Sequence, residues 1–278
     1  MPLSKNLRAK LDSLTSFLQD KSVIVAFSGG VDSALLTYLV KEYSKEYLAV
    51  FIKNTLTSNA EIKKAKKFAD DYEIRLKILF LDILSNEKFI ENPQNRCYIC
   101  KKTIFKKILK LKEEMNYDLI IEGSNADDLN DYRPGMKALD ELGIESPYIE
   151  YNINKTDIRT LSRYYDLPTA SKASMACLAS RISIGQPITT KKLDMVEQAE
   201  QYIKETFNLG QVRVRLHENY LARIEFEQSD LPYMLQKEKV DAIKNKLENI
   251  GFLYITIDLA GYRTGSMNLP QNYNNKLR

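Results

Sequence analysis

Short apolar runs alternate with amphipathic segments along the chain up to residue 165. The runs predict buried strands, at 22–27, 48–52, 76–81 and 119–121. The amphipathic segments, in which apolar residues recur every three or four positions, predict helices at 34–42, 60–72, 104–115 and 155–165. Strands separated by helices are typical of βαβ units and a parallel sheet, in which ligands bind beyond the carboxyl ends of the strands.

The pattern changes after residue 187. A helix is predicted at 190–207, and two segments of alternating residues, 212–216 and 221–226, follow it as a half-buried hairpin. A helix at 232–249 and a strand at 252–257 complete an α+β unit. We therefore expect an α/β protein with a parallel-sheet domain at 1–187 and a smaller α+β domain at 188–278.

Composition narrows the class of protein. The net charge is only +4, which argues against a dedicated nucleic-acid-binding surface, and no apolar run is long enough for a membrane span. The first residues predict an amphipathic helix and not a signal peptide. Three cysteines are an odd number, so we expect reduced thiols in a cytoplasmic protein. A single histidine excludes a histidine-rich metal site.

The segment Ser28-Gly29-Gly30-Val31-Asp32-Ser33 joins the first predicted strand to its helix. Two glycines let backbone N–H groups approach an anion, and the helix N-terminus adds positive potential. Ser28 and Ser33 add hydroxyl groups. Asp32 repels phosphate directly, so its expected partner is a Mg²⁺ ion that bridges phosphate oxygens.

This loop is not a Walker A motif, because the Gly-Lys-Ser/Thr sequence with its phosphate-binding lysine is absent. The pattern resembles the PP-loop of the N-type ATP pyrophosphatases. The resemblance implies that ATP is split between its α- and β-phosphates, so that a substrate is adenylated and pyrophosphate leaves.

Three cysteines allow several interpretations. Cys97 and Cys100 have C-x2-C spacing at the entry to a lysine-rich helix, where residues i and i+3 share a face, and Cys177 lies near the predicted domain boundary. Three thiolates suit a 4Fe–4S cluster with one open iron, whereas zinc needs a fourth ligand. The alternatives are thiols that pack as small apolar groups, or a redox pair with Cys177 as a separate nucleophile.

Further motifs make the resemblance more specific. They are the segments 127–135 (DDLNDYRPG), 155–159 (KTDIR), 176–181 (ACLASR), 212–215 (VRVR) and 258–268 (DLAGYRTGSMN). With the PP-loop, they resemble the LarE family of ATP-dependent sulfur transferases over nearly the whole chain. One departure is Ser183-Ile184-Gly185, where the family pattern has Pro-Tyr-Gly.

The resemblance implies a small-molecule substrate, pyridinium-3,5-biscarboxylic acid mononucleotide. Each carboxylate is adenylated with ATP and Mg²⁺, and sulfur then displaces AMP to give a thiocarboxylate for the nickel-pincer nucleotide. Some members sacrifice the cysteine that corresponds to Cys177. Others hold a 4Fe–4S cluster that delivers sulfide, and Cys97 and Cys100 favour this second type. The resemblance also implies a homo-oligomer.

Several residues follow as site candidates. Arg213 and Arg215 alternate on one strand face and are candidates for binding the substrate phosphate. Arg181 is a candidate for stabilising the acyl-adenylate or the Cys177 thiolate, and the resemblance adds Ser180 as a substrate-binding residue. Glu200 and Glu225 resemble family residues that bind a divalent metal. We also expect nucleotide or substrate contacts from residues near the predicted end of the strand at 119–121, namely Gly123, Asp127, Asp131 and Arg133.

Three other functions remain open. A tRNA thiolase of the PP-loop class also uses a C-x2-C pair and a later cysteine, and the lysine-rich helix suits a phosphate backbone. We expect no nucleic-acid partner, because no added basic or zinc-binding module is visible. An ammonia-using PP-loop ligase needs no cysteines, and a non-catalytic nucleotide-binding module needs no intact Ser28, Asp32 and Ser33.

Overall fold

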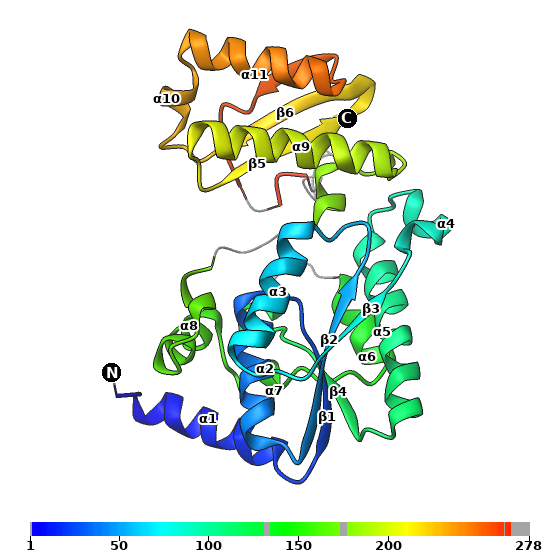
Figure 1. Ribbon diagram of the computed structural model, residues 1–278, viewed down its shortest axis with the longest axis vertical. Helices are drawn as coiled ribbons and strands as arrows, with labels where there is room; N and C mark the ends of the chain where they lie inside the picture. Colours follow the sequence, from blue (N-terminus) through cyan, green and yellow to red (C-terminus); the bar gives the residue numbers. More distant parts are fainter. Residues whose placement is uncertain (1, 131–133, 173–176, 264, 268–278) are drawn as a thin grey trace, which may run out of the picture. The chain divides into compact units, whose positions relative to one another are not determined.

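A computed structural model describes residues 2–130, 134–172, 177–263 and 265–267 (Figure 1). Contacts divide the chain into two compact units, which comprise residues 1–83 with 95–175, and 84–94 with 176–278. The segment 84–94 joins the second unit because the buried Asn92 amide donates to the carbonyls of Ile182 and Ser183. In the contact-based division, the chain passes from the first unit to the second between residues 175 and 176. The domain boundary predicted at 187/188 remains a prediction.

The first unit contains a parallel sheet of four strands in the order β3-β2-β1-β4. The strands are β1 (Ser22–Ala26), β2 (Glu46–Lys53), β3 (Leu76–Phe80) and β4 (Leu119–Ile121). Successive residues of β1 contribute to different cores, since Val23 and Val25 pack on one face and Ile24 on the other. Burial on both faces explains why the strands are continuous apolar runs, and it confirms the α/β class.

Helices cover both faces of this sheet. One layer comprises α1 (Lys5–Leu18), α2 (Val31–Tyr43), α3 (Asn59–Asp71) and α8 (Lys155–Tyr164), and the other comprises α5 (Arg96–Met115) and α6 (Pro134–Glu141). Shorter helical elements complete the unit: α7 (Pro147–Glu150), η2 (Ala126–Asn130) and η3 (Pro168–Ser171).

The strand order reverses between β1 and β4. The chain runs outward from β1 to β3 and then returns to place β4 on the other side of β1. Ligands of open parallel sheets bind at such a reversal, beyond the carboxyl ends of the two strands. Residues 28–33 follow β1 and residues 122–124 follow β4, so the loop with the chemical motif lies at this position.

The second unit has a three-stranded mixed sheet in the order β5-β6-β7. The hairpin of β5 (Val212–His217) and β6 (Leu221–Phe226) is antiparallel as predicted, and β7 (Tyr254–Ile257) pairs parallel to β6. The sheet forms an apolar core with α9 (Thr190–Phe207) and α11 (Lys237–Ile250). The remaining helical elements are η1 (Ile83–Ser85), α4 (Glu87–Ile90), η4 (Leu178–Arg181), η5 (Glu218–Tyr220) and α10 (Leu231–Met234).

Two predicted helices differ from the structure. The helix predicted at 104–115 begins earlier, at Arg96, so Cys97 and Cys100, which were expected at its entry, lie within the start of α5. The helix predicted at 232–249 is divided into α10 and α11, because the backbone of Gln236 is extended (φ −62°, ψ 135°). Among the described residues, no helix combines the length and the apolar character that a membrane span requires.

Candidate active site

The loop 28–33 leaves the N-terminus of α2 without a side-chain cap. Gly30 occupies the capping position, where its extended backbone (φ −77°, ψ 167°) provides no hydrogen-bonding side chain. The first N–H groups of a helix have no partner within the helix, so here they are available to an anion. Gly29 has φ +75°, a conformation that glycine adopts without strain. The loop therefore has the backbone geometry of a phosphate-binding site.

Hydroxyl groups fix the shape of this loop. The Ser33 hydroxyl accepts from the Ser28 N–H at 3.1 Å and lies 3.0 Å from the Ser28 hydroxyl. Asp32, in the first turn of α2, forms an ion pair with Lys155, whose Nζ lies 2.5 and 2.8 Å from the two carboxylate oxygens. A cation is thus already bound to the carboxylate that the sequence predicts as the magnesium ligand.

Gly123, which follows β4, packs against the same helix end. A Cβ atom at this position would lie 3.1 Å from the Ser33 nitrogen and 3.3 Å from the Asp32 carbonyl carbon. Glycine is therefore needed for close approach of two backbones, and its predicted contact with adenosine remains a prediction.

Two basic residues reach the loop from elsewhere in the first unit, Lys155 of the segment 155–159 and Lys172, and neither was among the predicted site residues. The Lys155 N–H donates to Asp127 at 2.9 Å, which fixes the start of α8 while the Lys155 ammonium binds Asp32. Lys172 donates to the Gly29 carbonyl at 2.6 Å. Both lie more than 120 residues from their partners, at sequence separations of 123 and 143, so no local pattern indicates these contacts.

Cys97 and Cys100 lie on the first turn of α5, and their i, i+3 spacing places them on one helix face. Cys97 is exposed and Cys100 is partly buried. The next residue, Lys101, bonds to the buried Glu122 at 3.3 Å, which ties this turn to the carboxyl end of β4. Glu122 also accepts hydrogen bonds from the hydroxyl groups of Ser124 and Ser146.

Cys177 lies in the second unit, immediately before η4, and is exposed. Its carbonyl accepts from the Ser180 hydroxyl at 2.6 Å and from the Arg181 guanidinium at 3.1 Å. Arg181 is buried and also makes a two-pronged ion pair with Glu200, at 2.8 and 3.1 Å. Ser180 and Arg181 therefore hold the backbone that carries the Cys177 thiol.

One face of the β5–β6 hairpin, which we call the charged face, carries five ionisable residues. They are Arg213, Arg215, His217, Arg223 and Glu225. The alternating residues of the opposite face, such as Val214 and Ile224, form the apolar core. The strand pattern thus confirms that Arg213 and Arg215 share a face.

The two arginines differ in their partners. Arg215 donates to the fully buried Glu225 at 2.7 and 3.0 Å. Arg213 donates to the carbonyl of Val212, and its Nε has no partner among the described residues. Burial, followed by the nearby Arg181, lowers the pKa of Arg213, although Glu200 opposes this effect. Arg213 is a buried cation whose charge no described carboxylate neutralises by an ion pair.

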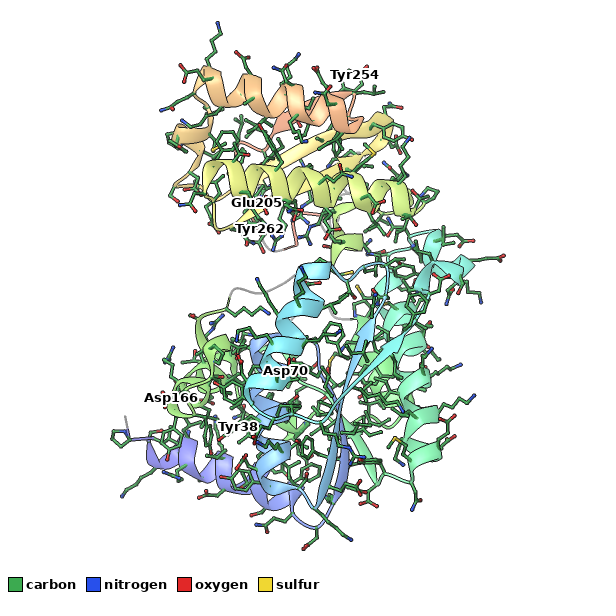
Figure 2. The ribbon with its side chains drawn as sticks, in the orientation of Figure 1. Tyr38, Asp70, Asp166, Glu205, Tyr254 and Tyr262 are labelled. Atoms are coloured by element: carbon green, nitrogen blue, oxygen red, sulfur yellow. The ribbon has the colours of Figure 1, made fainter. Side chains whose placement is uncertain are left out.

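The segment after β7 returns to the charged face. Tyr262, labelled in Figure 2, lies with its ring 5.5 Å from the Arg213 guanidinium. Its N–H donates to the Phe226 carbonyl, and a Cβ on the preceding Gly261 would lie 2.9 Å from that same oxygen. Ser266 donates to Glu225 at 2.5 Å. These contacts explain why this segment has glycine, tyrosine and serine at these positions.

The predicted metal ligands Glu200 and Glu225 have arginine partners in the structure. Glu200 binds Arg181, and Glu225 binds Arg215 and lies 3.3 Å from Arg223. Within the described residues, no three His, Cys, Asp or Glu side chains are grouped as a metal site. A divalent metal at Glu200 and Glu225 therefore remains a prediction, as does the three-cysteine cluster.

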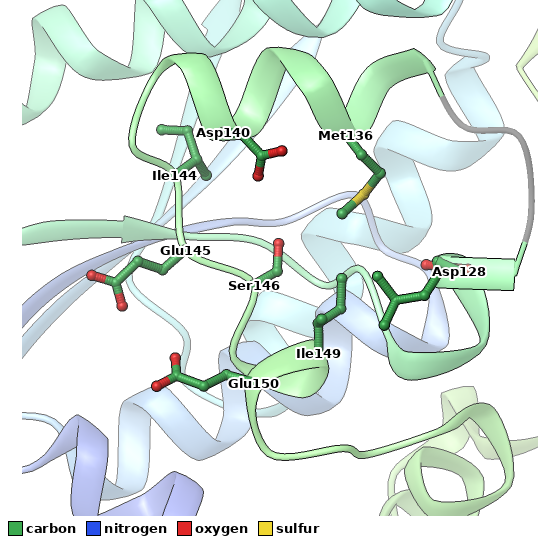
Figure 3. A pocket seen from close by; sticks show the side chains of 9 residues that line it. Asp128, Met136, Asp140, Ile144, Glu145, Ser146, Ile149 and Glu150 are labelled. Atoms are coloured by element: carbon green, nitrogen blue, oxygen red, sulfur yellow. The ribbon is translucent and has the colours of Figure 1, made fainter.

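The first unit also has a cavity of about 460 Å³ beside the carboxyl end of β4 (Figure 3). Its lining combines apolar side chains with acidic ones, including Asp128, Asp140, Glu145 and Glu150. Asp127, a predicted contact residue, caps α8 through the N–H of Lys155. Asp131 and Arg133 lie outside the described residues.

Comparison with known proteins agrees with this geometry. A family model of the PP-loop domain matches residues 3–130, which include the parallel sheet and the loop 28–33. The fold and the site thus define a PP-loop protein that binds ATP.

Similarity over the whole chain is more specific. The chain is 31% identical to the pyridinium-3,5-bisthiocarboxylic acid mononucleotide synthase of Lactiplantibacillus plantarum, over 94% of this chain and 95% of that protein. Uncharacterized proteins of Synechocystis and Methanocaldococcus jannaschii are 34% and 35% identical, each over 94% of this chain and 98% of its own length. The chain belongs to the LarE family of ATP-dependent sulfurtransferases.

His217, the only histidine, anchors the segment after Arg181 to β5. Arg223 donates to its Nε2 at 3.1 Å, so Nδ1 carries the proton and donates to the Ser183 hydroxyl at 2.9 Å. Burial, and then Arg223, lowers the pKa of His217, so the folded protein keeps the ring neutral.

We therefore predict that acid weakens the second unit through His217. The stabilising contribution is complete above the ordinary histidine pKa of about 6.5 and is lost as pH falls through the lowered pKa of the folded state. Thermal unfolding of the wild type should shift down by a few degrees between about pH 7.5 and about pH 5.5. His217→Gln, which keeps a hydrogen-bonding side chain, should shift less. An equal shift in both proteins would contradict this assignment.

Proposed function

We propose that this protein adenylates the carboxylates of pyridinium-3,5-biscarboxylic acid mononucleotide and converts them to thiocarboxylates for a nickel-pincer nucleotide. The name of the Lactiplantibacillus plantarum synthase supports this substrate, since the similarity covers nearly all of both chains. The observation that carries the reaction type is the uncapped N-terminus of α2, which adjoins two ammonium groups at the strand-order reversal.

Activation precedes sulfur transfer because a carboxylate has no good leaving group. A carboxylate oxygen attacks the α-phosphorus of ATP, the bond to the bridging oxygen breaks, and pyrophosphate leaves. The N–H groups of loop 28–33 and the helix N-terminus stabilise the negative charge that collects on this leaving group. A sulfur nucleophile then attacks the acyl carbon of the acyl-adenylate, and AMP leaves with the electron pair of the broken C–O bond.

A magnesium ion fits the oxygen donors of the loop. Asp32 already attracts one cation, Lys155, and the hydroxyl groups of Ser28 and Ser33 are hard oxygen ligands nearby. When bound, the ion would neutralise phosphate charge. Asp32 would hold it, and Ser28 and Ser33 would orient the loop around it.

The charged face of the second unit is suited to an anionic substrate. Arg213 has a donor without a described partner and no described ion pair, whereas Arg215 is neutralised by Glu225. A substrate phosphate or carboxylate would supply the missing negative charge. Arg213 is therefore our proposed substrate-binding residue, with Arg215 and Ser180 maintaining the surrounding structure.

A 4Fe–4S cluster is our proposed sulfur carrier. Cys97 and Cys100 fit as ligands, because they lie on one helix face with accessible positions, and Cys177 is an exposed third thiol. When bound, the cluster would offer an open iron for hydrosulfide. The alternative source of sulfur is Cys177 itself, which would be left as dehydroalanine.

The contacts of α5 give little support to a tRNA thiolase. Lys101 and Lys102 bind Glu122 and Glu141, and Lys107 donates to the Phe80 carbonyl. Because these three ammonium groups have partners within the first unit, they are less available to a phosphate backbone.

The function is tested by supplying the purified protein with ATP, magnesium and the pyridinium diacid. We expect pyrophosphate release that depends on the diacid, and a thiocarboxylate product detected by mass spectrometry. Cys177→Ala should abolish product but retain pyrophosphate release, because the thiol acts after activation, whereas Asp32→Asn should lose both. Wild-type protein that releases no pyrophosphate would refute the function, and loss of release in Cys177→Ala would place Cys177 in the activation step.

The sulfur carrier has its own test. Protein reconstituted without oxygen should bind about four iron atoms per chain and absorb visible light. Cys97→Ala and Cys100→Ala should each lose most of this iron, while the buried-core control Leu36→Met should retain it. Iron-free protein after reconstitution, together with a chain that loses the mass of hydrogen sulfide during turnover, would instead establish Cys177 as the source.

Arg213 and Arg215 form a matched pair for testing the anion site. Arg213→Met should weaken binding of the pyridinium mononucleotide by at least about tenfold, leave ATP affinity unchanged, and leave the unfolding midpoint equal or higher, because a buried unpaired charge is removed. Arg215→Met should destabilise the protein by about 3–5 kcal/mol, since it strands the buried Glu225. Equal destabilisation by both changes would show that Arg213 has only a structural role.

A further inference from the structure

Lys172 places an ammonium group on the loop that lacks a Walker lysine. Its Nζ lies 2.6 Å from the carbonyl oxygen of Gly29, inside the loop 28–33. An ammonium group has three N–H donors, and this contact uses one of them. Two donors therefore remain for a ligand next to the N-terminus of α2.

The charge of Lys172 is not neutralised by an ion pair with any carboxylate in the described ranges. Lys172 is also partly buried. Burial, and then the neighbouring Lys64, lowers the pKa of its ammonium group, while Glu61 opposes this effect. A desolvated cation without a counter-charge is stabilised when an anion binds beside it.

Helix α8 holds the backbone of Lys172 in place through a side-chain contact. Arg159 donates to the carbonyls of Ala170 and Lys172, at 2.5 and 2.9 Å. The start of α8 contributes Lys155, whose charge Asp32 already neutralises at 2.5 Å. Of these two lysines, Lys172 is thus the one with unused charge at the loop.

We propose that Lys172 binds the polyphosphate of ATP and stabilises the departing pyrophosphate. A Walker A loop has a lysine with this role within its own sequence, whereas Lys172 reaches the loop from a distant segment. The assignment rests on the proposed function for its reaction, but it concerns ATP affinity and is measured without the pyridinium substrate. A residue that contacts the polyphosphate contributes to binding of ATP and pyrophosphate and not to binding of AMP.

The test compares three variants of the full chain by calorimetric titration with ATP, pyrophosphate and AMP. Lys172→Met should weaken ATP and pyrophosphate binding at least about tenfold, as loss of a charge-assisted hydrogen bond predicts, and change AMP binding less than about twofold. Lys172→Arg should retain most of the ATP affinity. The control Lys64→Met removes an exposed neighbouring charge and should behave like the wild type.

Other outcomes overturn the assignment. Unchanged ATP affinity in Lys172→Met, or an equal loss for Lys172→Met and Lys64→Met, would mean that Lys172 only supports the Gly29 carbonyl or contributes general charge. An equal loss of affinity for ATP and for AMP would indicate that the substitution distorts the loop, and it would also overturn the assignment. Wild-type protein that binds ATP through Lys172 but never adenylates the diacid would refute the proposed function and leave the lysine assignment intact.

Discussion

The open N-terminus of α2 is the constraint on which the first unit depends. Because Gly30 offers no capping side chain, positive potential is concentrated at the end of β1, where the strand order reverses. Surrounding groups maintain this arrangement: Gly123 allows β4 to approach the helix end, and Lys155 balances the charge of Asp32. The loop therefore has a defined shape while its N–H groups remain available to phosphate.

The second unit handles charge in a different way. Its sheet has an apolar face against two helices and a charged face on which arginines and carboxylates are buried together. Ion pairs satisfy Arg181 and Arg215, because buried charges are costly unless they are paired. Arg213 departs from this rule. An unpaired buried guanidinium next to paired ones is a local energetic cost, and binding of an anion is what would offset it.

The sequence was sufficient for the sheet, the loop and the alternation on β5, because each depends on local pattern. Apolar runs mark β1 and β4, and the period of two places Arg213 and Arg215 on one face. It was not sufficient to tell these arginines apart, since their difference depends on where Glu225 projects from β6. Nor did it indicate Lys172, whose contact with Gly29 depends on how α8 packs on the sheet. The start of α5 was missed because its first turn lacks the apolar spacing found after residue 104.

The segment 155–159 supports the phosphate-binding loop through structural contacts. Lys155 neutralises Asp32, Asp157 forms the capping box of α8 with Asn154, and the buried Ile158 anchors the helix in the core. Arg159 then fixes the backbone of Lys172. One helical turn thus couples two ammonium groups to the phosphate loop through the rigidity of α8. Its spacing follows from helix geometry, since residues at i and i+4 lie on one face, from which Lys155 contacts Asp32 and Arg159 contacts the Lys172 carbonyl.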